Sequence, residues 1–223
     1  PLVLVSIPFA IGIHTVTAYL YCGLPGRGFW LTAILAPRFL ASAFAAGPAF
    51  LIILCYIIKK FTKFDPGWEA MQTLAKIVCY AIIANLFFFA CEVFVVYYSG
   101  IPSHLSHMQY LLFGLHGHNM MVPWMWSALI LMSVGAIFLL IPKLRNNHAL
   151  LPVTCAMIFF GAWIDKALGM IAGGFVPSPL HHVKEYAPTL QEGIIALGVY
   201  GTGFFVLTIL YKLATTVKEE VRG

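Results

Sequence analysis

Charged residues are scarce in this sequence. Lys, Arg, Asp and Glu together make up 9% of its 223 residues, whereas hydrophobic residues make up 61%. Such a composition excludes a soluble globular domain, which carries far more charge on its surface. Most of the charge that is present lies in loops between six long apolar stretches.

Each of those stretches has about the 20 residues that a helix needs to cross a ~30 Å hydrocarbon layer. They cover residues 2–21, 34–58, 75–98, 120–141, 149–171 and 194–213. The sequence therefore predicts an all-α integral membrane protein with six transmembrane helices in a single domain, 1–223. Because the chain begins at Pro1, already within an apolar stretch, we expect it to lack the N-terminal part of a longer protein.

Cysteine is also scarce and follows no ligand pattern. The five cysteines are scattered, and none forms a CxxC pair or a ferredoxin-like spacing; they are Cys22, Cys55, Cys79, Cys91 and Cys155. The sequence therefore predicts no iron–sulfur cluster held by this chain alone. We expect the cysteines to act as small hydrophobic residues of the core.

Histidines are spaced as HxxH and HxH between the third and fourth apolar stretches, at His104, His107, His116 and His118. Zinc sites usually combine such histidines with a cysteine or a carboxylate, and neither stands beside them. We predict no metal site. The favoured interpretation is that they are surface histidines that accept protons from a nearby cavity.

Basic residues gather on one side of the predicted bundle. The loops after the second and fourth stretches, the start of the third and the C-terminal tail hold nine of the 13: Lys59, Lys60, Lys63, Lys76, Lys143, Arg145, Lys212, Lys218 and Arg222. The opposite loops hold only Arg27 and Lys184. The positive-inside rule places the nine in the cytoplasm, so we predict a multi-pass protein of the inner (cytoplasmic) membrane. This distribution explains the net charge of +5 without a nucleic-acid partner.

Nearly all the other ionisable residues within the stretches lie towards the opposite, outer end. A charge held in hydrocarbon is costly and marks a functional site by default. The residues are His14, Arg38, Glu92 and Asp165, with Lys166 next to the last. Each also has a structural alternative: a hydrogen-bonded core histidine for His14, contact with the lipid headgroups for Arg38, and an ion pair with Arg38 for Glu92. Lys166 is expected to reach the surface or an anionic lipid, because adjacent helical residues point about 100° apart.

A quinone suits this set of residue types. Its carbonyl oxygens need partners that exchange protons, typically histidine and a carboxylate, and its isoprenoid tail needs an apolar entrance between helices. His14 and Asp165 meet the first need by type, with Glu92 as a further candidate for the proton chemistry. Tyr21 is a candidate for contact with the quinone, since its side chain suits packing against the quinone ring.

Two segments resemble a known family. The strings HTVTA (14–18) and APRFLASAF (36–44) belong to the first, and FxPSPL (175–180), preceded by Asp165 and Lys166, belongs to the second. Together they resemble the NrfD/PsrC family of quinone-interacting membrane subunits, nearest the DsrP/HmcC branch of sulfate-reducing anaerobes. That branch has about ten helices, which implies that this chain is the C-terminal part of such a protein.

The resemblance implies a subunit without haem or iron–sulfur clusters that exchanges electrons between menaquinol or menaquinone and a ferredoxin-like iron–sulfur subunit on the periplasmic face. It further implies partners that include a membrane cytochrome b, an iron–sulfur subunit and a multihaem cytochrome c. By motif position, His14, Arg38 and Asp165 would belong to the quinone region; Glu92 is added from its depth alone.

Two other functions stay open on the sequence. A b-type cytochrome needs paired histidines at matching depths on facing helices, and only His14 is clearly inside a stretch. A secondary transporter or proton channel needs binding groups near the midplane and a discontinuous helix, for which Pro48 offers one possible break.

Overall fold

The computed structural model describes residues 2–62, 65–180 and 182–222, and helices dominate all three segments. Six of the helices in this part of the chain are long and apolar enough to cross a membrane. The predicted all-α membrane fold with six spanning helices is thereby confirmed. One isolated bridge, between Leu115 and His118, accompanies the helices.

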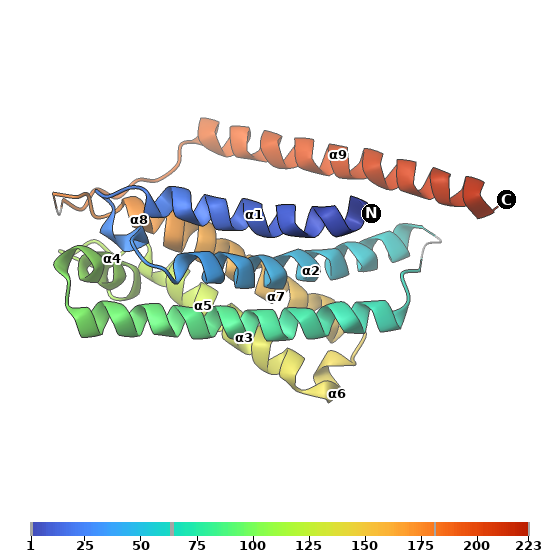
Figure 1. Cartoon of the computed structure of the whole chain (residues 1–223), viewed down its shortest axis with the longest axis horizontal. Helices are drawn as coiled ribbons and strands as arrows, with labels where there is room; N and C mark the ends of the chain where they lie inside the picture. The colour runs from blue at the N-terminus through green and yellow to red at the C-terminus, as the bar shows by residue number, and fades with distance from the viewer. Residues whose placement is uncertain (1, 63–64, 181, 223) are drawn as a thin grey trace. The chain divides into compact units, whose positions relative to one another are not determined.

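The chain divides into two compact units, Pro1–Lys184 and Glu185–Gly223. The first unit holds five of the spanning helices and their connections; Figure 1 traces their order. The second unit is built around one helix, α9 (Leu190–Arg222). Whether residues 1–223 form the single domain expected from the sequence stays a prediction.

The first unit consists of helices of very different lengths. They are α1 (Leu2–Cys22), η1 (Gly28–Trp30), α2 (Leu35–Phe61), α3 (Trp68–Ser99), α4 (Pro102–Leu112), α5 (Val122–Leu140), α6 (Pro142–Arg145), α7 (Leu150–Ile164), η2 (Asp165–Ala172) and α8 (Gly173–Phe175). The third span begins at Trp68, seven residues before the predicted start at residue 75, because its first turns are polar and extend beyond the apolar stretch. The segment η2 is a π-helix that continues α7 without a break.

Local sequence explains where several helices begin and end. Gly100 has φ 62°, a left-handed conformation that glycine adopts without strain, and it closes α3. Pro102 then begins α4, where the missing N–H of a proline costs no helical hydrogen bond. Chain reversal at this point places α4 beside the end of α3 (Figure 1).

Helix α2 is the centre of the first unit. It packs against α1, α3 and α7, while α5 packs against α7 and α3. Apolar side chains of α2, α3, α5 and α7 form one buried cluster, which includes Ile52, Ile82, Met132 and Ile158. A second buried cluster gathers around Trp30, Met108 and Tyr110, at the end of the unit that carries η1 and α4. We call that end, formed by η1, α4 and α8, the cap end.

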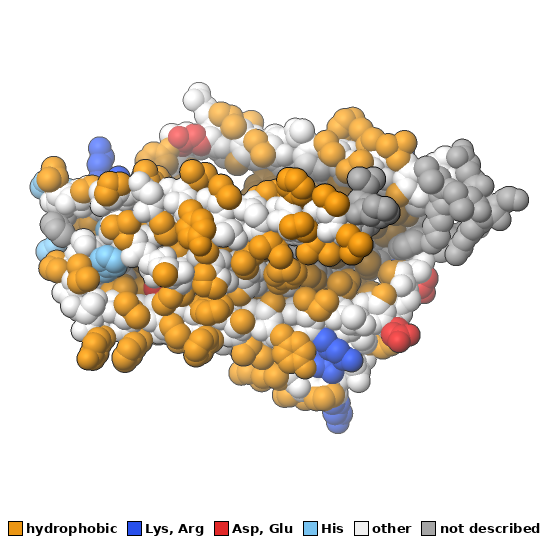
Figure 2. Space-filling view, viewed as in Figure 1, with side chains coloured by type: hydrophobic (Ala, Val, Ile, Leu, Met, Phe, Trp, Pro, Cys, Tyr) orange, Lys and Arg blue, Asp and Glu red, His pale blue; other side chains and the backbone are white. Residues whose placement is uncertain are grey.

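The opposite end carries the α2–α3 connection and α6, and we call it the basic end. In Figure 2, hydrophobic side chains cover most of the visible face of the first unit, whereas lysine and arginine side chains gather over α6. An apolar surface of this kind suits contact with lipid tails. Such a bias of lysine and arginine towards one end is typical of membrane-spanning bundles.

Candidate functional site

An arginine and two carboxylates meet in the interior, from three different helices. Arg38 of α2 donates from Nη2 to Oδ1 of Asp165 at 2.6 Å and from Nη1 to Oε2 of Glu92 on α3. The exposed fractions are 2% for Arg38, 3% for Glu92 and 0% for Asp165. The guanidinium also lies over the ring of Phe89, 4.9 Å from its centroid. Three of the predicted site residues are thus brought together.

Lys166 is a fourth member of this group, and the prediction that it reaches the surface or a lipid is wrong. Its Nζ is buried and lies over the ring of Phe39, 4.4 Å from the centroid. As expected for adjacent helical residues, Asp165 and Lys166 have different partners, Arg38 and Phe39. However, Phe39 stands next to Arg38 on α2, so neighbouring side chains of η2 meet neighbouring side chains of α2. We call Arg38, Glu92, Asp165 and Lys166 the ion cluster.

His14 lies elsewhere, in a groove between α1 and α2. The groove has a volume of about 560 Å³ and is lined by Ser6, Ile7, Ala10, Ile11, His14, Leu40, Ala43, Phe44, Gly47, Pro48, Phe50 and Leu51. Leu40 is two residues from Arg38, which turns it about 200° around the helix axis. The groove and the ion cluster therefore lie on different faces of α2. Among the described residues, no contact joins His14 to the cluster.

The hydrogen bond that His14 makes fixes which of its ring nitrogens carries the proton. Nδ1 lies 2.9 Å from the backbone oxygen of Ala10. A carbonyl oxygen only accepts, so Nδ1 must be the donor, and in the neutral ring Nε2 is left as an acceptor. Such a bond orients the ring.

Two features of α2 shape the opposite wall of the groove. A Cβ added at Gly47 would meet no atom within 4 Å, so the wall is hollow at that point. Pro48 has no N–H to donate to the carbonyl of Phe44, one turn earlier, so that carbonyl lacks its usual helical donor. The groove thus offers a large apolar volume and a few polar atoms, as small-molecule sites usually do.

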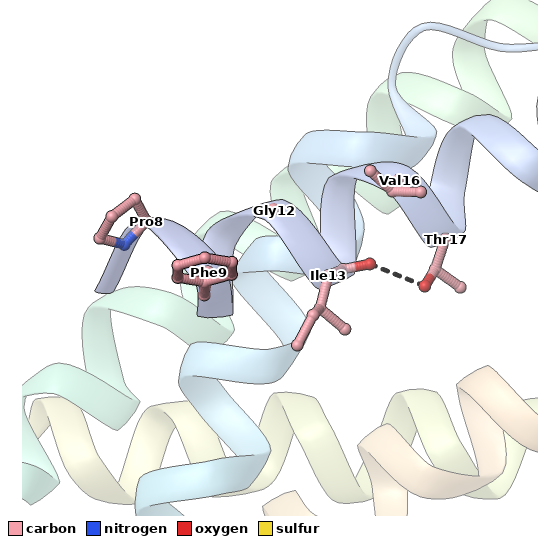
Figure 3. A pocket seen from close by; sticks show the side chains of 6 residues that line it. All are labelled: Pro8, Phe9, Gly12, Ile13, Val16 and Thr17. Carbon is pink, nitrogen blue, oxygen red and sulfur yellow. Dashed lines mark hydrogen bonds between the residues drawn. The ribbon is translucent and has the colours of Figure 1, made fainter. Parts of the chain in front are cut away.

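The other face of α1 carries a second apolar hollow, of about 550 Å³ (Figure 3). It is lined by Pro8, Phe9, Gly12, Ile13, Val16 and Thr17. The Thr17 hydroxyl donates to the backbone oxygen of Ile13 at 2.7 Å and is thereby occupied. This hollow has no ionisable side chain, and we assign it no chemistry.

Tyr21 belongs to the cap end. Its ring packs edge-on against Trp30 at 4.8 Å and lies 6.2 Å from Phe39, the residue beneath Lys166. Trp30 in turn donates from Nε1 to the backbone oxygen of Met170 at 2.9 Å and leaves no room for a side chain at Gly174. Tyr21 therefore links the end of α1 to the side of the ion cluster nearest the cap.

Hydrogen bonds and ring contacts of Arg27 and His107 also hold the cap end together. Arg27 donates to the backbone oxygen of Phe175 at 2.9 Å and lies over its ring. His107 stacks on Phe29, with centroids 5.5 Å apart, and its Nδ1 lies 2.8 Å from the backbone oxygen of Ser103. Within the described chain, no three His, Cys, Asp or Glu side chains are arranged to hold a metal ion.

Burial of His107 makes the stability of the cap end depend on pH. Burial lowers the pKa of His107 below its usual value of about 6.5, because the charged ring loses its hydration. The unfolded chain then binds more protons than the folded one, so stability is complete above about pH 6.5 and falls as the pH is lowered through that value. We expect thermal unfolding followed by tryptophan fluorescence to show this loss, and His107→Phe to reduce it. An unchanged pH dependence in His107→Phe would contradict the assignment.

Comparison with known proteins agrees with the resemblance in the sequence. The family model described as "Polysulphide reductase, NrfD" matches residues 1–177. The chain belongs to the NrfD family. The matched region contains the groove, the ion cluster and the cap end. The family resemblance stated from the strings around His14, Arg38 and Asp165 is therefore confirmed.

Two curated relatives give this membership more detail. A putative membrane subunit of a dimethyl sulfoxide reductase of Halobacterium salinarum is 23% identical over 91% of this chain and 50% of its own length. The integral membrane subunit of a menaquinone reductase of Nitratidesulfovibrio vulgaris is 24% identical over 87% of this chain and 46% of its own length. The chain thus spans about half the length of these relatives.

The predicted site residues divide among three places. Arg38, Glu92 and Asp165 form the ion cluster, while His14 lines the groove and Tyr21 packs at the cap end. Sequence reasoning missed the part of Lys166 in the cluster, whereas at Gly47 and Pro48 it weighed room for a flat ligand against close helix packing and favoured packing. The small residues around Pro48 were the available signal for the wall, since they leave room beside a helix.

Proposed function

We propose that this chain is a quinone-interacting membrane subunit of a respiratory redox complex. In this proposal it oxidises menaquinol, or reduces menaquinone, and exchanges electrons with a periplasmic iron–sulfur partner. Family membership and the relative named as a menaquinone reductase subunit support it. The observation that carries it is the groove between α1 and α2, where the hydrogen bond of His14 to Ala10 involves Nδ1 and leaves Nε2 available to a ligand.

The chemistry of a quinol fits this groove. Oxidation of a quinol releases two protons and two electrons, so its hydroxyl needs an adjacent base. Nε2 of His14 accepts such a proton, and the bond from Nδ1 to Ala10 holds the ring in place as it becomes charged. The volume of about 560 Å³ falls within the usual range for small-molecule sites. The isoprenoid tail would leave along the apolar wall formed by Leu51 and Ile7.

The position of the groove suggests where the electrons leave. The end of the groove that holds His14 and Leu40 faces the cap end, because α1 ends and α2 begins at the cap end. We propose that the cap end lies on the periplasmic side, with the basic end in the cytoplasm, in agreement with the positive-inside rule. A partner docked on η1, α4 and the Pro-rich segment 177–179 would then receive electrons over a short path.

The histidine content disfavours the alternative of a bis-histidine haem. Within the six spans of the described chain, His14 is the single histidine. Two axial imidazoles at one depth would require a second histidine from outside these spans. The quinone proposal needs only the one that is present.

Filling the groove tests the proposal directly. Gly47→Phe places a ring in the groove, where an added Cβ meets no atom within 4 Å, so we expect the KM for a menaquinol analogue to rise about tenfold or more in the assembled complex. Gly12→Phe is the matched control, because Gly12 is equally open but lies on the other face of α1 (Figure 3). Equal KM values in wild type and Gly47→Phe would contradict a quinone in the groove.

A further inference from the structure

The charges of the ion cluster do not balance unless Lys166 is counted. Arg38 carries one positive charge and keeps its proton in proteins. With Glu92 and Asp165 both ionised, these three residues alone have a net charge of −1 in the membrane interior, which is costly. The ammonium of Lys166 is attracted by both carboxylates and repelled by Arg38, so it lies within their electrostatic reach.

In the described part of the chain, three buried atoms of the cluster are left without a hydrogen-bond partner, and one of them is Nε of Arg38. Among the described residues, neither Oδ2 of Asp165 nor Nζ of Lys166 has one. Both belong to neighbouring residues at the start of the π-helix η2, a kind of helical segment that is frequent at functional sites. Oδ1 of Asp165 is held by Arg38, so Oδ2 is the oxygen that is free to take a proton.

With Arg38 and Glu92 both ionised and paired, two arrangements of protons make the cluster neutral. In one, Lys166 is an ammonium and Asp165 a carboxylate; in the other, Lys166 is a neutral amine and Asp165 a carboxylic acid. In both, Arg38 and Glu92 keep opposite charges and cancel. The arrangements contain the same number of protons, so they interconvert with no change in net charge.

We propose that the ion cluster holds one exchangeable proton, which moves between Oδ2 of Asp165 and Nζ of Lys166. In the transfer the O–H bond of Asp165 breaks and an N–H bond of Lys166 forms; no electron moves. Among the described residues no ion pair joins the two groups directly, so the transfer requires a bridging water molecule. The role of this step in quinone chemistry rests on the proposed function. The presence of an exchangeable proton in the ion cluster does not depend on that function.

Infrared spectroscopy of the assembled complex tests this without any quinone turnover. In Lys166→Met the amine is gone, so the proton must reside on a carboxyl, and we expect one protonated-carboxyl band per copy of this chain. That band should shift when aspartate is labelled with ¹³C and should vanish in Lys166→Met/Asp165→Asn. Lys60→Met, which removes a lysine at the basic end, should leave the wild-type spectrum unchanged.

Other outcomes decide against the proposal. Two ionised carboxylates in Lys166→Met, or a band that persists in the double variant, would overturn it. If Lys166→Met does not accumulate in the membrane, the double variant should, because it restores neutrality, and failure of the double variant to accumulate would also overturn it. The quinone site is tested separately by Gly47→Phe, so a failure of one account leaves the other in place.

Discussion

His14→Leu should lower the rate of quinol-dependent electron transfer by about 10²- to 10⁴-fold in the assembled complex. This is the usual effect of removing a positioned acid–base group. Leucine keeps the groove apolar and similar in volume, so we expect the quinol to bind. Its hydroxyl proton then lacks the base that accepts it. A fall in kcat with little change in KM is therefore the expected result, measured as reduction of the partner by a menaquinol analogue.

The control for this variant lies on the same helix. Thr17→Val removes a polar side chain of α1 that is bonded to the backbone one turn earlier, as His14 is, but that lines the hollow of Figure 3 and not the groove. Its activity should equal that of the wild type. A rate for His14→Leu close to that of Thr17→Val would remove His14 from the proton chemistry.

Arg38→Met should destabilise the first unit by about 3–5 kcal/mol. Breaking a buried ion pair by removing one partner is costly because it leaves an uncompensated charge, and here two carboxylates lose their common partner. We expect little folded protein in the membrane and a lower unfolding temperature for what remains. Arg27→Met, which removes a partly exposed arginine with one hydrogen bond, should cost only about 1 kcal/mol.

A compensating variant distinguishes two causes of the stability loss in Arg38→Met, which are unpaired charge and lost packing. Arg38→Met combined with Glu92→Gln and Asp165→Asn removes all three charges, so most of the lost stability should return. If the triple variant accumulates no better than Arg38→Met, the cost comes from packing against Phe89 and not from unpaired carboxylates.

The sequence predicted the spanning helices well because their signal is local. A stretch of about 20 apolar residues is visible without knowledge of its neighbours. The polar first turns of α3, from Trp68, were missed because a helix that extends out of the hydrocarbon has no apolar signature there. The ion pair between Arg38 and Glu92 was foreseen as the structural alternative for Glu92, since both fall at one depth.

The rest of the candidate site depends on how helices turn about their axes. Depth along the membrane follows from residue number, so His14, Arg38 and Asp165 were expected at one level. Residue number does not tell which face of a helix packs against which neighbour. In the structure, Arg38 and the groove lie on different faces of α2. Lys166 was misplaced for a related reason: the ring of Phe39, supplied by another helix, gives its amine a buried neighbour.

The most direct measurement maps a bound quinone onto the chain. A menaquinone analogue with a photoreactive group on its ring would be activated in the intact complex, and the labelled peptides identified by mass spectrometry. The account predicts labels on α1 near Ala10 and His14 and on α2 between Leu40 and Leu51, suppressed by excess menaquinone and by Gly47→Phe. Labels confined to other helices, and unchanged in Gly47→Phe, would contradict it.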